Sequence, residues 1–431
     1  MGTFVGIRLR RRTRAASLIA LLGVVATVST SSAMAAPGDW SQLGYGPAHN
    51  SYQPSETALS AGTISRLRWA WHRDVGSIVI GRPAVVGGVA YVGVGLQSGA
   101  TTSSLVALDL ASGRTLWTRS LSGSAGGDSS PAVAGGSVYF TTDSAQTPGS
   151  GSTLWAVNAS DGSVRWSATG LSDQRISSPV YADGMVFVSS YGAPGNSVWL
   201  RAFDAGTGAL RWLSIETGWE NPTGTPAVAG GRVFVAAGAV LAFDEATGQH
   251  LWTSLPGIPN PYKGELSVAG GRVFAPTRSG LYALDAVTGS TLWRLAATGG
   301  VPERAPAVHR GIVYAQLVGG TTTRLVALRA ADGSRVWSRI VFTSPRRYDT
   351  VAATPALANG LIYVGAPTQR SYGLYVYGAS TGRQLHKNGM GSGAGRIFGG
   401  PVVSHGMVLV ASQRGGIYAF ELGPLSATKL P

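Results

Sequence analysis

The chain has 431 residues, of which 44% are hydrophobic and 13% are charged, and a formal net charge of +14. This composition supplies a large hydrophobic core and excludes an intrinsically disordered chain. The sequence contains no cysteine, which excludes disulfides, thiolate metal sites, a cysteine nucleophile and a lipid anchor on cysteine. The 62 glycines show no three-residue period, so they exclude a collagen-like fold and indicate many tight turns.

Residues 1–35 have the pattern of an export signal. Five arginines between positions 8 and 14 precede an apolar stretch, residues 15–28, and the chain then reaches Ala33-Met34-Ala35. This order is typical of a secretory signal peptide with an A-x-A cleavage site, and its apolar stretch is shorter than the roughly 20 residues of a membrane span. We expect cleavage after Ala35, secretion, and no transmembrane segment in the mature chain.

The basic residues of the mature chain do not favour a nucleic-acid partner. Loss of the five signal arginines lowers the net charge to about +9, and the remaining basic residues are mostly arginines scattered along the chain. Proteins that bind nucleic acid more often gather basic residues on one face, with aromatic side chains among them. A scattered basic surface suits acidic cell-wall polymers or anionic membranes, or reflects a bias of composition toward arginine.

After a lead-in segment, residues 36–66, one sequence unit recurs along residues 67–423. Its first half reads P-A-V-x-G-G-x-V-Y-V and starts eight times, at Pro83, Pro131, Pro179, Pro226, Leu266, Pro306, Pro355 and Pro401. Its second half reads L-x-A-L-D-x-x-T-G-x-x-L-W and ends at Trp117, Trp166, Trp212, Trp252, Trp293, Trp337 and His386. Each unit contains four short apolar runs rich in β-branched and aromatic residues, which predicts four antiparallel strands and hence one propeller blade.

Three features of the unit have structural explanations. The G-G pair between the first two runs suits a tight hairpin with positive φ. The tryptophan that ends the unit is expected to fill the seam between neighbouring blades. The aspartates of the second hairpin are expected to bond nearby backbone amides rather than act as acids; they are Asp109, Asp204, Asp244 and Asp285.

The eighth unit stops at Leu422 without its final L-W piece, and the missing piece occurs at the start of the repeat. Leu67-Arg68-Trp69 has the same pattern as Leu210-Arg211-Trp212. The sequence therefore predicts an all-β fold, an eight-bladed propeller of four-stranded antiparallel blades, closed by pairing of an N-terminal strand with residues 417–422 and followed by a tail, residues 424–431. Such closure removes the open sheet edge. A seven-bladed ring is the main alternative.

These units resemble the PQQ-like (quinoprotein-like) β-propeller repeats of secreted bacterial proteins. The lead-in adds to the resemblance with Trp40-Ser41-Gln42-Leu43-Gly44, then Asn50-Ser51, then Glu56 to Ser60. The resemblance implies a propeller over nearly the whole mature chain. It leaves the activity open, since the family contains alcohol and glucose dehydrogenases as well as a non-enzymatic outer-membrane assembly lipoprotein.

The sequence departs from both kinds of relative. The dehydrogenases often carry adjacent cysteines against the quinone and hold Ca²⁺ with a Glu, an Asn and an Asp, whereas this chain has no cysteine and no motif that maps onto that triad. The assembly lipoprotein needs a cysteine for its lipid, which this chain also lacks. We therefore predict no cofactor, and PQQ with Ca²⁺ belongs only to the alternative of a PQQ-dependent dehydrogenase.

Strand alternation separates two faces of the ring. The short hairpins of every unit lie on one face, so the variable second-to-third loops and the blade connections lie on the other, where binding residues usually occur. No catalytic residue or metal ligand is predicted. The candidate ligand-binding residues, at the channel mouth on that face, are Asp128, Arg175, Glu216, Trp219, Glu220, Lys263, Glu265, Glu303, Arg304, Arg346, Arg347, Asp349 and Arg396. Solvated loop charges, some paired between blades, are the alternative interpretation.

The fifth unit is unusual because it replaces x-P-A-V with Glu265-Leu266-Ser267-Val268. A carboxylate beside the channel would serve as a metal ligand or general base, or would pair with Arg304 on the next connection; we favour the pairing. The histidines show no metal-ligand spacing, and we expect them at surface or turn positions; they are His49, His72, His250, His309, His386 and His405.

Three functions are open at this point. We favour an exported, monomeric, non-catalytic module that binds a protein, peptide or cell-envelope ligand on its variable-loop face, because the units are regular and no catalytic set stands out. The alternatives are a PQQ-dependent dehydrogenase of an alcohol or sugar, and a propeller that binds or cleaves a glycan through exposed aromatic residues near acidic loops.

Overall fold

The computed structural model of the protein describes residues 1–2, 36–76, 78–79, 81–95, 102–123, 129–143, 151–172, 175–192, 197–217, 224–255, 265–343, 353–367, 372–391, 394–397 and 399–424. Its contacts divide the chain into two units, Met1–Ser31 and Ser32–Pro431, and all elements named below belong to the second. Among the described residues, no helix is long and apolar enough to cross a membrane.

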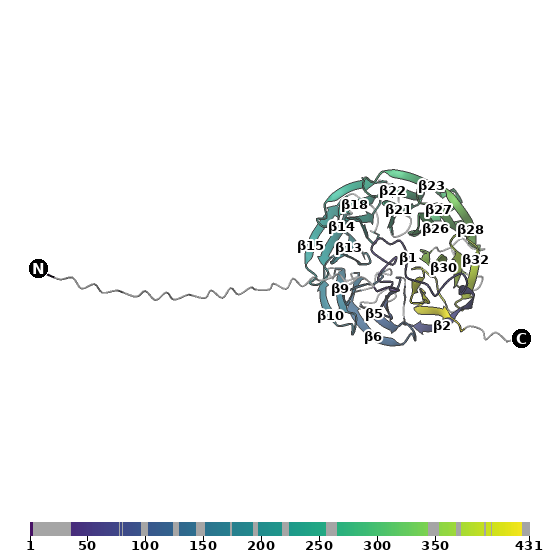
Figure 1. Cartoon of the computed structure of the whole chain (residues 1–431), viewed down its shortest axis with the longest axis horizontal. Helices are drawn as coiled ribbons and strands as arrows, with labels where there is room; N and C mark the ends of the chain where they lie inside the picture. Colours follow the sequence, from purple (N-terminus) through teal and green to yellow (C-terminus); the bar gives the residue numbers. More distant parts are fainter. Residues whose placement is uncertain are drawn as a thin grey trace. The chain divides into compact units, whose positions relative to one another are not determined.

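The strands of the second unit form eight antiparallel sheets around a ring, which confirms the predicted eight-bladed, all-β propeller (Figure 1). From the innermost strand outward, blade 1 consists of β3 (Ala84–Val86), β4 (Val89–Val94), β5 (Thr102–Asp109) and β6 (Thr115–Ser122), and blade 2 consists of β7 (Ala132–Ala134), β8 (Ser137–Thr142), β9 (Thr153–Asn158) and β10 (Val164–Ala168). Blade 3 consists of β12 (Val180–Ala182), β13 (Met185–Gly192), β14 (Ser197–Asp204) and β15 (Leu210–Glu216), and blade 4 consists of β16 (Ala227–Ala229), β17 (Arg232–Ala236), β18 (Val240–Asp244) and β19 (His250–Ser254).

Blades 5 to 8 follow the same order. Blade 5 consists of β20 (Ser267–Ala269), β21 (Arg272–Thr277), β22 (Gly280–Asp285) and β23 (Thr291–Ala296), and blade 6 consists of β25 (Ala307–His309), β26 (Ile312–Gly319), β27 (Thr322–Arg329) and β28 (Arg335–Thr343). Blade 7 consists of β29 (Ala356–Ala358), β30 (Leu361–Pro367), β31 (Tyr372–Gly378) and β32 (Gln384–Gly389), and blade 8 consists of β33 (Val402–Ser404), β34 (Met407–Ala411), β35 (Gly416–Leu422) and β2 (Leu67–Asp74). Short additional elements are β1 (Tyr52–Gln53), β11 (Arg175–Ile176), β24 (Val301–Pro302) and the 3-10 turns η1 (Ile64–Arg66) and η2 (Ala297–Gly299).

Blade 8 is completed by the N-terminal strand β2, as the sequence predicted. Strand β2 pairs antiparallel with β35, from Leu67 opposite Leu422 to Asp74 opposite Gly416. The register shifts between Trp69 and Trp71, and the outermost pair of each of the other seven blades has a bulge at the equivalent place. In that register Trp71 lies opposite Ala419, as Trp212 lies opposite Ala202, so the tryptophan of the repeat unit is Trp71 and not Trp69, two residues later than the sequence pattern indicated. The N-terminal strand supplies the outermost strand of blade 8 and closes the ring.

The tryptophans of the outermost strands fill the seams between blades, which confirms their predicted structural role. Each ring covers a glycine in the second hairpin of the next blade: a Cβ built on Gly208 would lie 2.6 Å from Trp166, and one on Gly248 would lie 2.4 Å from Trp212. Most of these indoles also donate a hydrogen bond to the same hairpin, as Trp166 Nε1 does to Ala205 O at 3.1 Å. The seam therefore requires a large flat ring on one blade and a glycine with positive φ on its neighbour.

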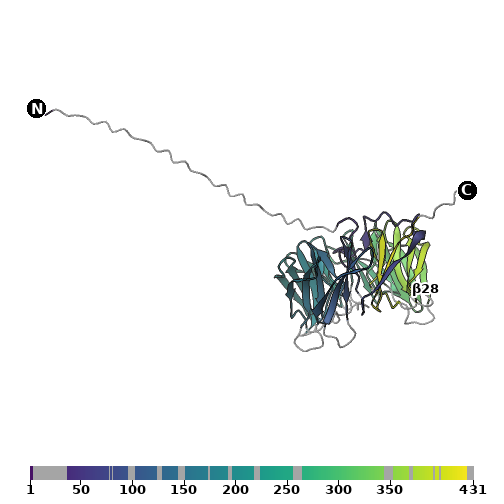
Figure 2. The ribbon, with the colours of Figure 1, turned by 90° about the horizontal axis from the view of Figure 1, so that it is seen from below.

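The short hairpins lie at one end of the sheets, which we call the turn face. Antiparallel pairing places the Gly87–Gly88 turn and the Asp109 hairpin at the same end of blade 1. In that hairpin, the Asp109 carboxylate accepts hydrogen bonds from Ser112 N and Ser112 Oγ, and these bonds lower its pKa. The aspartates at positions 204, 244 and 285 bond their turns in the same way, which confirms them as turn residues. We call the opposite end of the sheets the loop face. Figure 2 shows the ring from its edge, so that both faces are seen in profile.

The lead-in segment, residues 36–66, has a role that the sequence did not predict: it crosses the ring axis and bonds the innermost strand of every blade. Trp40 exchanges two backbone hydrogen bonds of 2.7 Å with Val85 in blade 1. The side chains of Gln42 and Gln53 reach backbone groups of blades 3 and 8. In the other five blades a strand N–H donates to a lead-in carbonyl at 2.8 Å: Val133 to Ser41, Val228 to Pro47, Val268 to Ala48, Val308 to Asn50 and Leu357 to Ser51.

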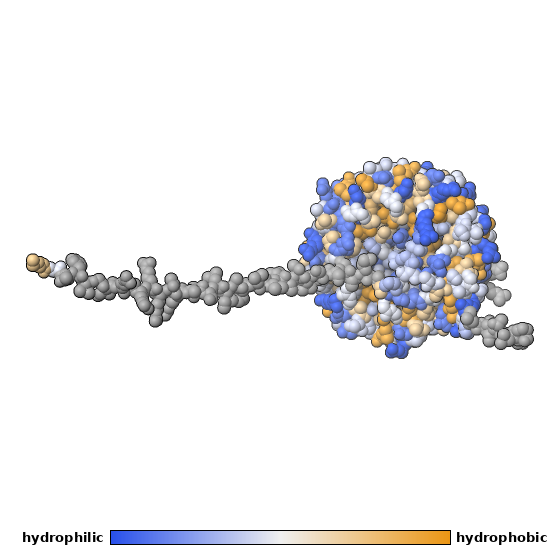
Figure 3. All heavy atoms as spheres, in the orientation of Figure 1, coloured by the Kyte–Doolittle hydropathy of each residue, from blue (hydrophilic) through white to orange (hydrophobic). Residues whose placement is uncertain are grey.

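The path of the lead-in places it toward the turn face. Asp39 Oδ1 accepts a hydrogen bond of 2.9 Å from Gly87 N in the first turn of blade 1. Positive φ angles at Tyr45, His49 and Ser51 turn the chain repeatedly, so that successive backbone groups meet successive blades. Seen from the side of Figure 1, the centre of the ring is covered by residues of intermediate hydropathy (Figure 3). The axis is therefore closed at its turn-face end by the protein's own chain.

The seam predicts unequal effects of two glycine substitutions. Gly231 and Gly248 have φ of 71° and 73°, so alanine at either position is strained by about 1–2 kcal/mol. A Cβ at Gly231 meets open space, whereas one at Gly248 meets the Trp212 ring. We expect Gly248→Ala to lower the free energy of unfolding by about 2 kcal/mol more than Gly231→Ala, measured by urea denaturation. Equal losses would show that the seam tolerates a wider spacing.

Candidate functional site

One repeat position lines the axis at the loop-face end of the innermost strands. It is the residue just before the proline that starts each unit, or before Leu266 in blade 5, and in blade order it is Arg82, Ser130, Ser178, Thr225, Glu265, Ala305, Thr354 and Gly400. Hydrogen bonds connect this position between blades: Arg82 N donates to Ser130 Oγ at 2.8 Å, and Ser130 N donates to Ser178 Oγ at 2.9 Å. Against this background of small polar residues, the charged residues of blades 1 and 5 stand out.

Arg82 is almost completely buried, with 2% of its surface exposed, and its side chain crosses from blade 1 to blade 7. Its guanidinium donates from Nη2 to Thr354 O at 3.0 Å and from Nη1 to Ser51 Oγ of the lead-in at 3.3 Å. Gly400 of blade 8, with φ of 85°, makes room for this crossing, since a Cβ there would lie 2.7 Å from Arg82 Nη2. Burial lowers the pKa of Arg82 to about 10, so the side chain stays charged at neutral pH.

Glu265 pairs with Arg304, which confirms the pairing that the sequence favoured. Arg304 Nη1 lies 3.5 Å from Glu265 Oε1, and Thr354 Oγ1 donates to Glu265 Oε2 at 3.3 Å. The two charged side chains are 16% and 12% exposed, so the pair reaches solvent while remaining largely enclosed. Glu265 thereby connects the consecutive blades 5, 6 and 7.

His49 of the lead-in lies in the same region, so the expectation that every histidine occupies a surface or turn position was wrong for this residue. Only 2% of its surface is exposed, and neither ring nitrogen has a hydrogen-bond partner within the described residues. Burial lowers the pKa of His49 to about 4, against the opposing effect of the Glu265 carboxylate. The imidazole is therefore neutral at physiological pH. The path of the lead-in, which carries His49 into the ring, is the physical reason for its burial.

We call His49, Arg82, Glu265, Arg304 and Thr354 the axial cluster. At neutral pH it contains two guanidinium groups, one carboxylate and one neutral imidazole, and therefore one excess positive charge. Because these side chains are largely enclosed, this charge is less screened than a surface charge and favours a negatively charged group that approaches from the loop face. The cluster is chemically suited to bind a carboxylate or a phosphate.

The predicted site residues fall into two groups. Those outside the described residues are Asp128, Trp219, Glu220, Lys263, Arg346, Arg347 and Asp349. The described ones are Arg175, Glu216, Glu265, Glu303, Arg304 and Arg396, and of these the structure brings Glu265 and Arg304 together on the axis.

Two of the described candidates lie away from the axial cluster. Glu216 ends the outermost strand β15, and its Oε1 lies 4.0 Å from Nδ1 of His250 on the outermost strand of blade 4. Arg175 lies in β11, which pairs with β13, and its charge acts on Asp143 in blade 2. Charged residues of the connections are therefore distributed between the axis and the seams of the ring.

Sequence reasoning missed Arg82, His49 and Asp143. Arg82 occupies the same repeat position as Glu265, so an alignment of the eight units would have shown it as a second charged exception. Asp143 follows β8 and accepts a hydrogen bond of 3.0 Å from Ile176 N in blade 3. Burial raises the pKa of Asp143 to about 6, although this bond and Arg175 oppose the shift. No pattern in the sequence indicates the burial of Asp143.

The axial cluster does not fit the calcium–quinone pair of the dehydrogenase alternative. Calcium takes six to eight oxygen ligands, usually with several carboxylates. Among the described residues, no group of three or more His, Asp or Glu side chains is arranged to hold a metal ion. The carboxylate of the cluster, Glu265, is already engaged by Arg304 and Thr354.

Comparisons with known proteins agree on the fold. The family model described as outer membrane protein assembly factor BamB matches residues 57–193 and 196–423. No curated protein matches the chain. A quinohemoprotein alcohol dehydrogenase from Pseudomonas putida HK5 is similar in structure with a TM-score of 0.70 and 15% identity, over 92% of this chain and 82% of that one.

Two further solved structures are similar. A europium-containing methanol dehydrogenase has a TM-score of 0.70 and 16% identity, over 90% of this chain and 98% of that one. BamB from Moraxella catarrhalis has a TM-score of 0.58 and 15% identity, over 85% of this chain and 99% of that one. At these identities the likeness shows a shared fold, and a fold alone does not identify an activity.

Asp143 predicts a pH-dependent effect on stability. Its pKa is raised in the folded state, so its contribution to stability is fully present below the unfolded-state value of about 4 and is lost as the pH rises through about 6. Asp143→Asn removes this loss, and we expect it to raise the free energy of unfolding by about 1–2 kcal/mol at pH 7.5 relative to its effect at pH 4. Urea denaturation at both pH values measures the difference.

Asp244→Asn is the matched control for this prediction. Hydrogen bonds from Thr247 lower the pKa of Asp244, so its contribution is lost as the pH falls. The control variant should therefore show the opposite pH trend. A parallel response of the two variants would contradict the burial of Asp143 as the cause.

Proposed function

We propose, from the premise that this chain belongs to the PQQ-like β-propeller repeat family, that it is an exported binding protein without catalytic activity. It holds a protein or cell-envelope ligand on the loop face, and the axial cluster receives an acidic group of that ligand. The observation that carries this proposal is the pair of guanidinium groups, Arg82 and Arg304, around the one carboxylate of Glu265.

The two ends of the axis support an approach from the loop face. The lead-in covers the turn-face end through its bonds to all eight blades. Glu265 and Arg304 belong to the loop-face end of the innermost strands and are partly exposed, whereas Arg82 and His49 beneath them are buried. A ligand group that enters from the loop face therefore meets Arg304 first and the buried charge of Arg82 behind it.

The charge of the protein agrees with an acidic ligand. The mature chain carries about nine excess positive charges, which attract polyanions and acidic protein surfaces at long range. Short-range selection then rests with the axial cluster, because guanidinium groups form paired hydrogen bonds with carboxylate and phosphate oxygens. An acidic wall polymer or an acidic segment of an envelope protein has this chemistry.

Loss of the axial charge is expected to weaken capture of the ligand. Arg304→Gln should reduce by at least about tenfold the amount of ligand that the immobilised mature protein retains from an envelope extract. Arg211→Glu is the matched control, because Arg211 is exposed on the outermost strand β15 and pairs with Asp204. Undiminished capture by Arg304→Gln would remove the axial cluster from the proposed site.

The dehydrogenase alternative makes a different prediction. Mature protein mixed with PQQ and Ca²⁺ should gain the absorbance of bound quinone and reduce an electron-accepting dye in the presence of an alcohol or sugar. For a binding protein we expect neither signal, because the axial carboxylate is already engaged by Arg304 and Thr354. Dye reduction that requires both PQQ and substrate would overturn the proposed function in favour of the alternative.

A further inference from the structure

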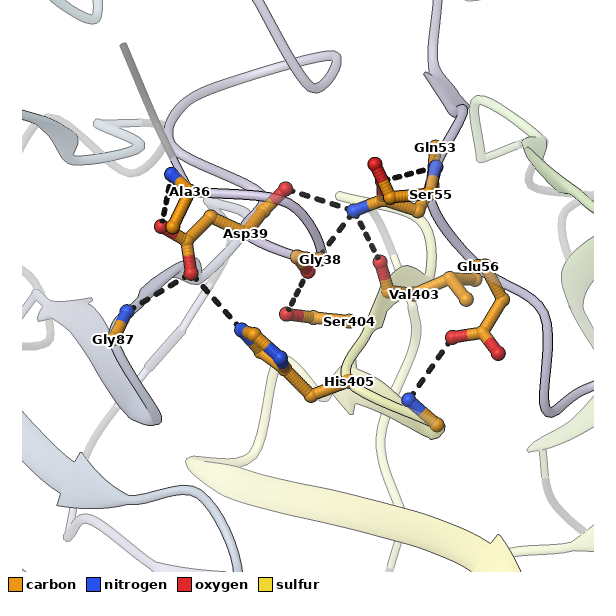
Figure 4. Close-up of polar contacts among 11 residues, drawn as sticks. Ala36, Gly38, Asp39, Gln53, Ser55, Glu56, Gly87, Val403, Ser404 and His405 are labelled. Carbon is orange, nitrogen blue, oxygen red and sulfur yellow. Dashed lines mark hydrogen bonds and ion pairs between the residues drawn. The ribbon is translucent and has the colours of Figure 1, made fainter. Parts of the chain in front are cut away.

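The first residues of the lead-in form a tight turn that brings the nitrogen of Ala36 to a carboxylate. Asp39 N donates to Ala36 O at 3.0 Å, and Gly38 between them has φ of 98°. Proline at the second position and glycine at the third are typical of a type II turn. The turn places Ala36 N at 2.8 Å from Asp39 Oδ2 (Figure 4).

The Asp39 carboxylate is a buried junction between the lead-in and two blades. Asp39 is 1% exposed, and its Oδ1 accepts hydrogen bonds of 2.9 Å from Gly87 N of blade 1 and from Nε2 of His405 of blade 8 (Figure 4). Ala36 itself is exposed, so its nitrogen reaches the carboxylate from the solvent side. A positively charged donor at this position would gain considerably more than a neutral amide.

Ala36 is also the first residue after the A-x-A signal Ala33-Met34-Ala35. The local turn and the export signal therefore meet at one peptide bond. We propose that the Ala35–Ala36 bond is the processing site of this chain, and that the α-ammonium group released there forms an ion pair with the buried Asp39 carboxylate and locks the lead-in over the ring axis.

The chemical step is the hydrolysis of one peptide bond by a peptidase of the export pathway. One water is consumed, the carbonyl carbon of Ala35 leaves as a carboxylate, and the nitrogen of Ala36 becomes an ammonium group. Before cleavage Ala36 N is a neutral amide with a single hydrogen to donate. After cleavage it carries a full positive charge and three hydrogens, and one of them keeps the contact with Asp39 Oδ2.

The position of the ion pair explains why it acts as a lock. Blades 1 and 8 meet where the ring closes, and Asp39 contacts the first turn of both. Neighbouring bonds tie the same place together: Gln53 Nε2 donates to Gly38 O at 3.0 Å and to Asp39 O at 2.8 Å, and Ser404 Oγ donates to Gly38 O at 2.7 Å (Figure 4). The charge created by processing therefore stabilises the closure seam itself.

The ion pair has a defined pH dependence. An adjacent carboxylate raises the pKa of an α-ammonium group above its ordinary value of about 7.7–8. Toward alkaline pH, with the Asp39 carboxylate ionised, the stabilisation is fully present up to about pH 7.7 and is lost as the pH rises through the raised value. The other described titratable groups that face Asp39 are His405, Tyr45 and Tyr91, and both tyrosine pKa values are raised, by burial first and by Asp39 second.

The test compares two forms of the mature protein. One begins at Ala36 with a free amino group, and the other retains Ala33-Met34-Ala35 and so has an amide at Ala36. We expect the unfolding equilibrium constant of the free form to be three- to tenfold smaller at pH 7, roughly the effect of one charged hydrogen bond. The ratio of the two unfolding equilibrium constants should approach one at pH 10. With Asp39→Asn in both forms, the two unfolding equilibrium constants should become equal at pH 7. With His405→Gln in both forms, the three- to tenfold difference between them should remain.

Mass spectrometry of the exported protein supplies a second readout that does not depend on stability. We expect its first residue to be Ala36. An N-terminus at any other residue overturns the processing site. Equal stability of the free and extended forms at pH 7, or a difference that persists with Asp39→Asn, overturns the ion pair.

Discussion

The innermost strand of each blade presents unpaired backbone groups to the ring axis, and the rest of the structure depends on how these groups are satisfied. Each is the innermost strand of its blade, and only contacts with the lead-in, which in blade 7 include pairing of β1 with β29, satisfy its inner side within the described residues. An unpaired buried amide or carbonyl costs on the order of 1–3 kcal/mol. Eight such edges converge on one line. The lead-in solves the problem with one segment that turns repeatedly and bonds each blade in turn. Because that segment must follow the circle of strands, its path is fixed.

This fixed path makes a nearly symmetric ring asymmetric along its axis. The turn-face end receives the lead-in, with Asp39 and Gln53 in its contacts to blades 1 and 8. The loop-face end keeps the repeat position that precedes each innermost strand, where serine or threonine fills four of the eight places and Arg82 and Glu265 are the two charged residues. Binding chemistry can therefore develop where the repeat is interrupted, while the other units maintain the scaffold.

The sequence predicted those features that leave a side-chain pattern in every unit. The strands recur in all eight blades, the seam tryptophan in seven and the hairpin aspartate in four, and the replacement strand carries its seam tryptophan at Trp71. The pairing of Glu265 with Arg304 was predictable because both are charged residues of the connections that lead into neighbouring blades. In each of these cases a local rule, repeated, determines the contact.

The path of the lead-in was not predictable for a corresponding reason. Its bonds to the blades are mostly made by main-chain carbonyl groups, which every residue possesses, so no residue type marks the contact. The burial of His49 follows from that path, and the burial of Arg82 depends on Ser51 of the lead-in and on space left by Gly400 in another blade. These properties arise from segments that are far apart in sequence, and a periodic pattern contains no information about them.

The order in which these contacts form gives the proposed processing step its place in folding. Strand β2 pairs with β35, and Asp39 bonds His405, so the first folded residues of the mature chain need partners about 350 residues away. The N-terminal segment therefore cannot settle until the last blade exists. The proposed cleavage of the Ala35–Ala36 bond belongs to this interval, before the contacts of Asp39 are complete. Completion of blade 8 then brings Gly87 and His405 around Asp39, and an ammonium group already released at Ala36 closes the seam that forms last.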